Sequence, residues 1–169
     1  SPSVSALVKA LSHAEPHVRL YAAEALASIG PKAGAATKDL ARAVSDPIPG
    51  VRWAACEALG SIGPAAQSAV PQLIEALKDE FLYVRICAAG ALGSIGPKAQ
   101  TALEALRVAA NDPTLRNEAE WALNRIAGVE SGEPVVSPPV PVAAIAPQPQ
   151  AAVAQTGNPP VDWNTTTGR

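Results

Sequence analysis

The sequence has few of the residues on which enzyme sites and metal sites usually depend. Among its 169 residues there are two His, two Cys, no Met and only six aromatic side chains. The cysteines, Cys56 and Cys87, have no histidine near them, so they do not make a zinc site; we expect small residues packed between helices, not a disulfide. No apolar run reaches the roughly 18–20 residues that a membrane-spanning helix needs.

Catalytic motifs are also missing. There is no Ser-His-Asp set, no Cys beside a His, no cluster with metal-ligand spacing and no glycine-rich phosphate loop. The sequence therefore predicts no catalytic, cofactor-binding or metal-binding residue. It indicates no compartment, but because Met is absent and the chain starts at Ser1, we expect an exported or processed product.

The charge is evenly balanced over most of the chain. Residues 1–128 carry 12 Lys and Arg against 12 Asp and Glu, so the net charge of −2 comes from residues 129–169. A neutral domain is a poor nucleic-acid binder, because affinity for phosphates depends on clustered Lys and Arg. We expect no nucleic-acid partner.

One motif recurs along the chain with a period of 33 residues. It reads VRLYAAEALASIGP from Val18, VRWAACEALGSIGP from Val51 and VRICAAGALGSIGP from Val84. A divergent copy, LRNEAEWALNRIAG, begins at Leu115. Self-similarity at this period indicates a stacked solenoid, an all-α fold in which each repeat contacts only its neighbours.

Glycine and proline residues within the repeats predict where the helices end. Gly30, Gly63 and Gly96 each precede a proline, a combination typical of a helix terminus. We expect half a repeat in residues 1–12, three full helix pairs and a closing helix at residues 115–126. Residues 1–128 then form one solenoid domain.

The helical period also predicts which residues form the core. Counting from the repeat Val or Leu, offsets 0, 4, 7, 8 and 11 fall on one stripe about 100° wide and hold Val, Ala, Ala, Leu and Ile. Leu59 is the Leu of the second copy. Offsets 5 and 9 are mostly Ala, Gly or Cys, small enough for neighbouring helices to approach closely.

The motif VRxxAAxALGxIGP followed by LIxALKD resembles HEAT-like repeats of the type named after phycobilisome lyases. The resemblance covers about residues 4–128 and implies antiparallel helix pairs stacked into a right-handed superhelix. It also implies that the Arg at offset 1 pairs with a loop Asp of an adjacent repeat. The residues that match this structural ladder are Arg19, Arg52, Arg85, Arg116, Asp46, Asp79 and Asp112.

Some proteins with HEAT-like repeats of this type are enzymes, so the resemblance also allows an enzymatic function. Bilin lyases attach a chromophore, and a HEAT-repeat hydroxylase holds two irons with His-Glu pairs. Neither His13 nor His17 is followed by Glu, so the di-iron pattern is absent here. The alternative function is therefore a subunit of a bilin lyase.

The aromatic residues lie away from the predicted core stripe. The resemblance places their face on the concave side of the stack, where an apolar strip with a polar rim would mark an interaction site. The predicted partner-binding residues of the repeats are Leu20, Tyr21, Trp53, Glu57, Tyr83, Ile86 and Trp121. The alternative is that these side chains fold down between repeats, or that Trp121 closes the end of the stack.

Residues 129–169 differ sharply in composition. They contain eight prolines and no charged residue between Glu133 and Asp162, which predicts an extended tail, partly polyproline II, with no core of its own. This tail is either a disordered linker or a segment that docks on a surface with Trp163 as an anchor. Together these features predict a non-enzymatic adaptor or accessory subunit of a larger complex, with a protein or peptide partner.

Overall fold

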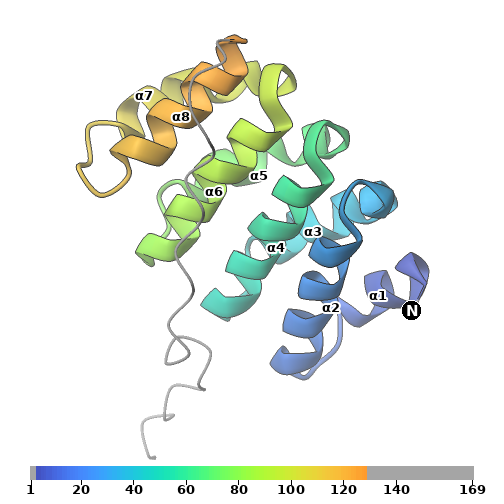
Figure 1. Ribbon diagram of the computed structural model, residues 1–169. Coiled ribbons are helices and arrows are strands. Elements are labelled where there is room, and N and C mark those ends of the chain that lie inside the picture. Colours follow the sequence, from blue (N-terminus) through green and yellow to red (C-terminus); the bar gives the residue numbers. More distant parts are fainter. Residues whose placement is uncertain (1–2, 129–169) are drawn as a thin grey trace, which may run out of the picture.

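In the computed structural model of the chain, residues 3–128 form a stack of helices and no strand (Figure 1). The predicted tail and its anchor Trp163 lie outside these described residues. Four long helices alternate with shorter ones. The elements are α1 (Val4–Ala10), α2 (Pro16–Ile29), η1 (Gly30–Ala36), α3 (Thr37–Ala43), α4 (Pro49–Ile62), η2 (Gly63–Ala69), α5 (Val70–Ala76), α6 (Leu82–Ile95), η3 (Gly96–Ala102), α7 (Leu103–Ala109) and α8 (Arg116–Ala127).

A 3₁₀ helix follows each of the first three long helices. The long helix α4, for example, ends at Gly63, whose φ of 68° and ψ of −137° suit only glycine, because a side chain there would clash with the backbone. Pro64 then stands in the first turn of η2, where its missing N–H costs no hydrogen bond. The expected helix ends are confirmed, and the seven-residue helices α3, α5 and α7 each follow directly on a 3₁₀ segment.

The helices form two rows (Figure 1). The long helices α2, α4, α6 and α8 pack directly on one another, while α1, α3, α5 and α7 lie behind them and cover their apolar side. In the second row α3 and α5 barely touch, because the 3₁₀ segments lie between them. The all-α solenoid that the repeats predict is confirmed.

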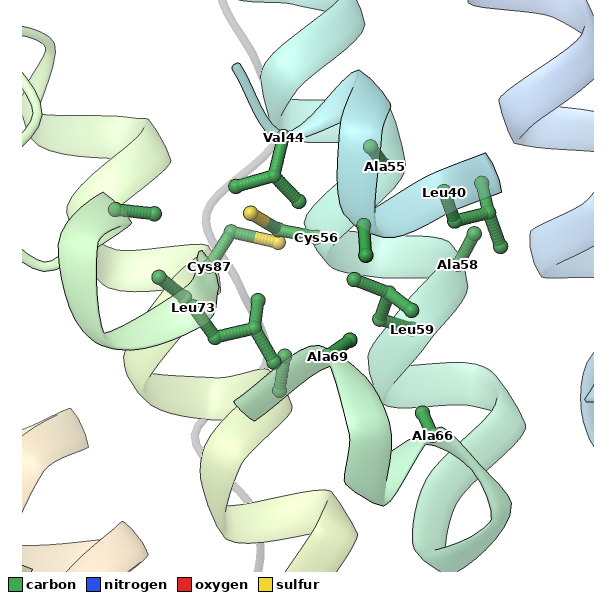
Figure 2. Packing of buried hydrophobic residues seen from close by; sticks show 14 of the residues in the cluster. Leu40, Val44, Ala55, Cys56, Ala58, Leu59, Ala66, Ala69, Leu73 and Cys87 are labelled. Atoms are coloured by element: carbon green, nitrogen blue, oxygen red, sulfur yellow. The ribbon is translucent and has the colours of Figure 1, made fainter. Parts of the chain in front are cut away.

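The core lies between the two rows, on the predicted stripe. In α4 the five residues of that stripe are at most 1% exposed, and Leu59 is completely buried. Figure 2 shows Leu59 beside Leu40 of α3 and Leu73 of α5, so one leucine of the long helix packs against its neighbours in the second row. Burying a leucine side chain contributes about 1.5–3 kcal/mol, and the equivalent leucines Leu26 of α2 and Leu92 of α6 are also completely buried.

Small residues set the distance between the long helices. A Cβ atom on Gly60 of α4 would lie only 3.2 Å from the Cα atom of Ala91 of α6. The two backbones therefore almost touch, and a larger side chain at position 60 would push the helices apart. The small residues at offset 9 have the packing role that the sequence predicts for them.

Candidate protein-binding face

The loops between repeats are joined by arginines that bridge consecutive repeats. Arg19 donates from Nε and Nη2 to both carboxylate oxygens of Asp46, at 2.6 and 2.9 Å, and from Nη1 to the carbonyls of His13 and Ala14, both at 2.9 Å. The hydrogen bonds to Asp46 raise the pKa of Arg19, even though burial acts in the opposite direction. Such two-point pairing fixes orientation as well as distance.

Arg52 repeats this arrangement one repeat further on. It donates from Nε and Nη2 to Asp79, at 2.7 and 3.0 Å, and its guanidinium carbon lies 5.6 Å from the centre of the Phe81 ring. Its Nη1 reaches the carbonyl of Asp46 at 2.9 Å. Burial is the largest influence and lowers the pKa of Arg52, but the hydrogen bonds and charge of Asp79 outweigh it and the pKa is raised.

The ladder weakens towards α8. Arg85 Nη2 is 4.0 Å from Oδ2 of Asp112, whose other oxygen accepts hydrogen bonds from the backbone N–H and the hydroxyl of Thr114, at 2.9 and 2.7 Å. These bonds lower the pKa of Asp112. Arg116 donates only to the carbonyl of Ala110, at 3.3 Å, among the described residues. The arginines and aspartates thus join repeats and do not form an anion site.

The structure does not produce the continuous apolar strip that the sequence predicts. Leu20 and Ile86 are only 4% and 8% exposed, so the prediction that they lie open on the surface is wrong. A helical wheel treats each helix alone, whereas here the long helices pack almost backbone to backbone. At that spacing Leu20 and Ile86 are covered, whereas Trp53 at the same offset of α4 stays half-buried.

Tyr83 lies in the first turn of α6. Its ring centre is 5.6 Å from that of Phe81, and its hydroxyl is buried. Burial, the largest influence, raises the pKa of Tyr83, although the charge of Arg52 lowers it. Tyr83 is therefore part of the aromatic packing around the arginine ladder.

Trp121 folds down onto the preceding helix, as in the alternative that the sequence leaves open. A Cβ atom on Gly93 of α6 would lie 2.3 Å from Cζ3 of the Trp121 ring, so the ring occupies the space that this glycine leaves free. Its Nε1 atom is buried. Trp121 fixes α8 to α6 and presents only part of its ring to solvent.

The long helices expose one side to solvent, which we call the long-helix face. A polar hollow lies on this face. Trp53 of α4 is half-buried, and one turn further on Glu57 is exposed. The hollow, about 330 Å³ in volume, lies between α2 and α4 and is lined by Glu24, Ala27, Ser28, Glu57 and Ser61. The sequence shows this site only as two residue pairs 33 apart, Glu24 with Glu57 and Ser28 with Ser61.

The two glutamates repel each other across the hollow. Partial burial, followed by the charge of Glu24, raises the pKa of Glu57. Within residues 3–128 neither glutamate forms an ion pair, whereas Asp46, Asp79 and Asp112 in the loops between repeats each have an arginine partner. The hollow therefore favours a positive charge that the described chain does not supply.

The buried cysteines show no sign of catalytic activation. Cys56 and Cys87 are free, fully buried and side by side in the core (Figure 2). Burial raises the pKa of Cys56 to about 12 and that of Cys87 well above its usual value, so both stay protonated at neutral pH. Within the described residues no group of His, Cys, Asp and Glu could hold a metal ion, and no helix is long and apolar enough to cross a membrane.

A stack of helix pairs joined repeat by repeat through small residues and arginine ladders is an α-solenoid. The sequence pattern of HEAT repeats matches residues 4–69 and again residues 64–124, so the chain belongs to the HEAT repeat family. Repeats of this family generally mediate protein–protein interaction. The family match concerns the repeats and does not extend to the lyase-type features of the resemblance.

A crystal structure of an engineered protein from the Northeast Structural Genomics Consortium has a similar fold. Its sequence is 27% identical to the chain, with a TM-score of 0.64. The similarity covers 74% of this chain and 62% of that one, so the chain matches less than two thirds of the engineered protein. No curated protein matches the chain.

Proposed function

We propose that this chain is a non-enzymatic adaptor, an accessory or assembly subunit of a larger complex that binds a protein segment on its long-helix face. The observation that carries this proposal is the hollow between α2 and α4, where Glu24 and Glu57 have no ion-pair partner among the described residues. Nearby Trp53 supplies a half-buried aromatic surface. The lyase alternative gains no support from any of these features.

The chemistry of the face suggests what the partner presents. A Lys or Arg side chain would fit between the two carboxylates and relieve their repulsion. An adjoining apolar side chain would pack on Trp53, since tryptophan is among the residues that contribute most to binding energy at interfaces. Paired charges of this kind also accelerate association and select against partners with acidic segments.

The first experiment is native purification with mass spectrometry of the proteins that co-elute, followed by binding measurements with the identified partner. Glu57→Arg should weaken the partner's affinity about 10-fold or more, because it replaces attraction by repulsion in the hollow. The control is Glu75→Arg, which makes the same charge change on α5, where Glu75 is exposed and 3.8 Å from Lys78. It should change the affinity less than about 3-fold.

Two results would contradict the proposal. Equal losses in the two variants would mean that the effect comes from net charge and not from the long-helix face. Unchanged affinity in both variants would place the binding surface elsewhere, for example on the tail, where Trp163 stays a predicted anchor.

A further inference from the structure

An apolar groove lies between α5 and α7, in the row of short helices behind the long-helix face. Its volume is about 260 Å³, and most of its lining is aliphatic: Ile74 and Leu77 of α5 and Ala105, Val108 and Ala109 of α7. Val108 is 64% exposed, more than any other large hydrophobic residue of the described chain. We call this surface the α5–α7 groove.

The groove departs from the repeat pattern at two positions of α7. One repeat earlier, 33 residues back, Ala105 and Val108 correspond to Gln72 and Glu75 of α5. Gln72 is half-buried with a buried Oε1 atom, so a longer side chain stands at the position where Ala105 leaves space. The Glu75 side chain is 75% exposed although α5 lies between α3 and α7 in its row. The exposure of Val108 is therefore a property of this position in the repeat and does not come from the nearby end of the stack.

The two charges that line the groove, Lys78 and Glu104, already have partners. Lys78 Nζ is 3.8 Å from Oε1 of Glu75, and Arg107 Nη1 donates to Oε2 of Glu104 at 3.2 Å, each pair within one helix. The two charges are also of opposite sign, so a charged ligand would be attracted by one and repelled by the other. The aliphatic lining and the balanced charges favour an uncharged, aliphatic occupant.

The chain carries a segment of this chemistry soon after α8. Residues 134–146 read PVVSPPVPVAAIA and follow the described part of the chain. They contain five valine or isoleucine side chains and no charge. Four prolines restrict the backbone of the segment, which lowers the entropy that ordering it would cost.

This segment is close enough to reach the groove. Helices α7 and α8 lie side by side and are joined by residues 110–115, so they run in opposite directions and the end of α8 lies beside the start of α7 (Figure 1). A path halfway around α7, a cylinder about 10–12 Å across, is about 15–20 Å long. An extended chain advances roughly 3.1 Å per residue, so the seven steps from Gly128 to Val135 span about 20 Å. Because the segment is tethered, it meets the groove at an effective concentration on the order of millimolar, which favours it over a free partner of the same chemistry.

We propose that residues 135–142 of this chain bind in its own α5–α7 groove, with valine side chains against Ile74, Leu77 and Val108. The segment lies along the groove as an extended rod, the form in which proline-rich segments are recognised by apolar grooves. The contact covers Val108 and holds the tail on the short-helix side, so the long-helix face stays open to a partner. It does not depend on the proposed function of that face.

Millisecond hydrogen exchange of the full chain, read by mass spectrometry, tests this contact. The amides between Val135 and Val142 should exchange about 10-fold or more slowly than those of a free peptide of residues 134–146. Val108→Glu, which places in α7 the residue type that α5 has at the equivalent position, should return them to the rate of the free peptide. The control is Tyr21→Glu, the same charge change at a side chain that is 63% exposed on α2, and it should leave the protection in place.

A variant of the segment tests the other side of the contact. Val140→Asp changes the segment and not the helix stack, and it should abolish the protection as Val108→Glu does. Free-peptide rates in the unaltered chain, or protection that survives Val108→Glu, would overturn the proposal. Dilution distinguishes the chain's own segment from that of a second copy. Protection that stays constant over about 100-fold dilution supports the proposal, whereas protection that falls with dilution, together with a dimer in sedimentation velocity, would assign the groove to a second copy instead.

Discussion

Replacement of Gly93 by alanine should lower the free energy of unfolding, although alanine is the better helix former. Inside a helix, alanine is favoured over glycine by roughly 1 kcal/mol. At position 93, however, the new Cβ atom would lie 2.3 and 2.7 Å from two ring carbons of Trp121 and 3.0 Å from the Cα atom of Ala122. Overpacking of this kind costs about 1–3 kcal/mol, so we expect a net loss of up to about 2 kcal/mol.

Gly90 provides the matched control on the same helix. A Cβ atom there would meet nothing within 4 Å, so Gly90→Ala should raise the free energy of unfolding by roughly 1 kcal/mol. The helix preference is common to both substitutions and cancels in their comparison. The difference between Gly90→Ala and Gly93→Ala is then the overpacking cost alone, about 1–3 kcal/mol.

Urea denaturation followed by circular dichroism measures both values, and tryptophan fluorescence of the folded Gly93→Ala variant reports whether Trp121 has moved into solvent. In a Trp121→Ala background the cost of Gly93→Ala should fall, because only the contact with Ala122 remains. If Gly93→Ala stabilises the chain as much as Gly90→Ala, Trp121 does not lie on Gly93. The prediction that Trp121 belongs to an exposed apolar strip would then stand.

Three further predictions concern the core and the loops. Leu59→Ala should cost about 2–5 kcal/mol because its side chain is fully buried; a change within about ±0.5 kcal/mol in denaturation would refute the core register. Asp79→Ala should cost about 3 kcal/mol because it removes the buried partner of Arg52 and leaves only the exposed Glu80, 3.5 Å away, and Asp112→Ala should cost clearly less; equal losses would contradict the weakening of the ladder. In the folded chain Cys56 and Cys87 should resist a thiol reagent at pH 8, since burial raises the pKa of Cys56 to about 12, and react at once in urea; rapid labelling without urea would show that they are accessible.

The sequence predicts the fold well because the information is local and repeated. Apolar residues such as Leu59 recur at one place in each copy, and a glycine followed by proline ends each of the first three long helices, so periodicity alone gives the core and most helix boundaries. The sequence pattern does not predict the 3₁₀ segments. They follow from the Gly-Pro step, which admits a tight turn but does not reveal how many residues continue it.

The site was less predictable because it depends on how close the helices lie. Leu20 and Ile86 look exposed on a single helix, yet both are buried in the packed stack. Trp121 lies on Gly93, which belongs to the preceding repeat, so the contact cannot be seen from the sequence of one helix. A helical wheel shows one helix without the helices packed against it. It therefore cannot distinguish a solvent-exposed aromatic residue from one that fills a gap between repeats.

The spacing of the arginine ladder has a consequence at the level of the gene. Arg19 and Arg52 each pair with a carboxylate 27 residues ahead and donate to carbonyls five or six residues behind. Removal of residues 51–83 would bring Arg85 next to the carbonyl of Asp46, in the position that Arg52 holds now. Insertion or loss of one repeat would therefore lengthen or shorten the protein in steps of 33 residues, and each step would add or remove one long helix of surface while keeping the spacing of the arginine ladder.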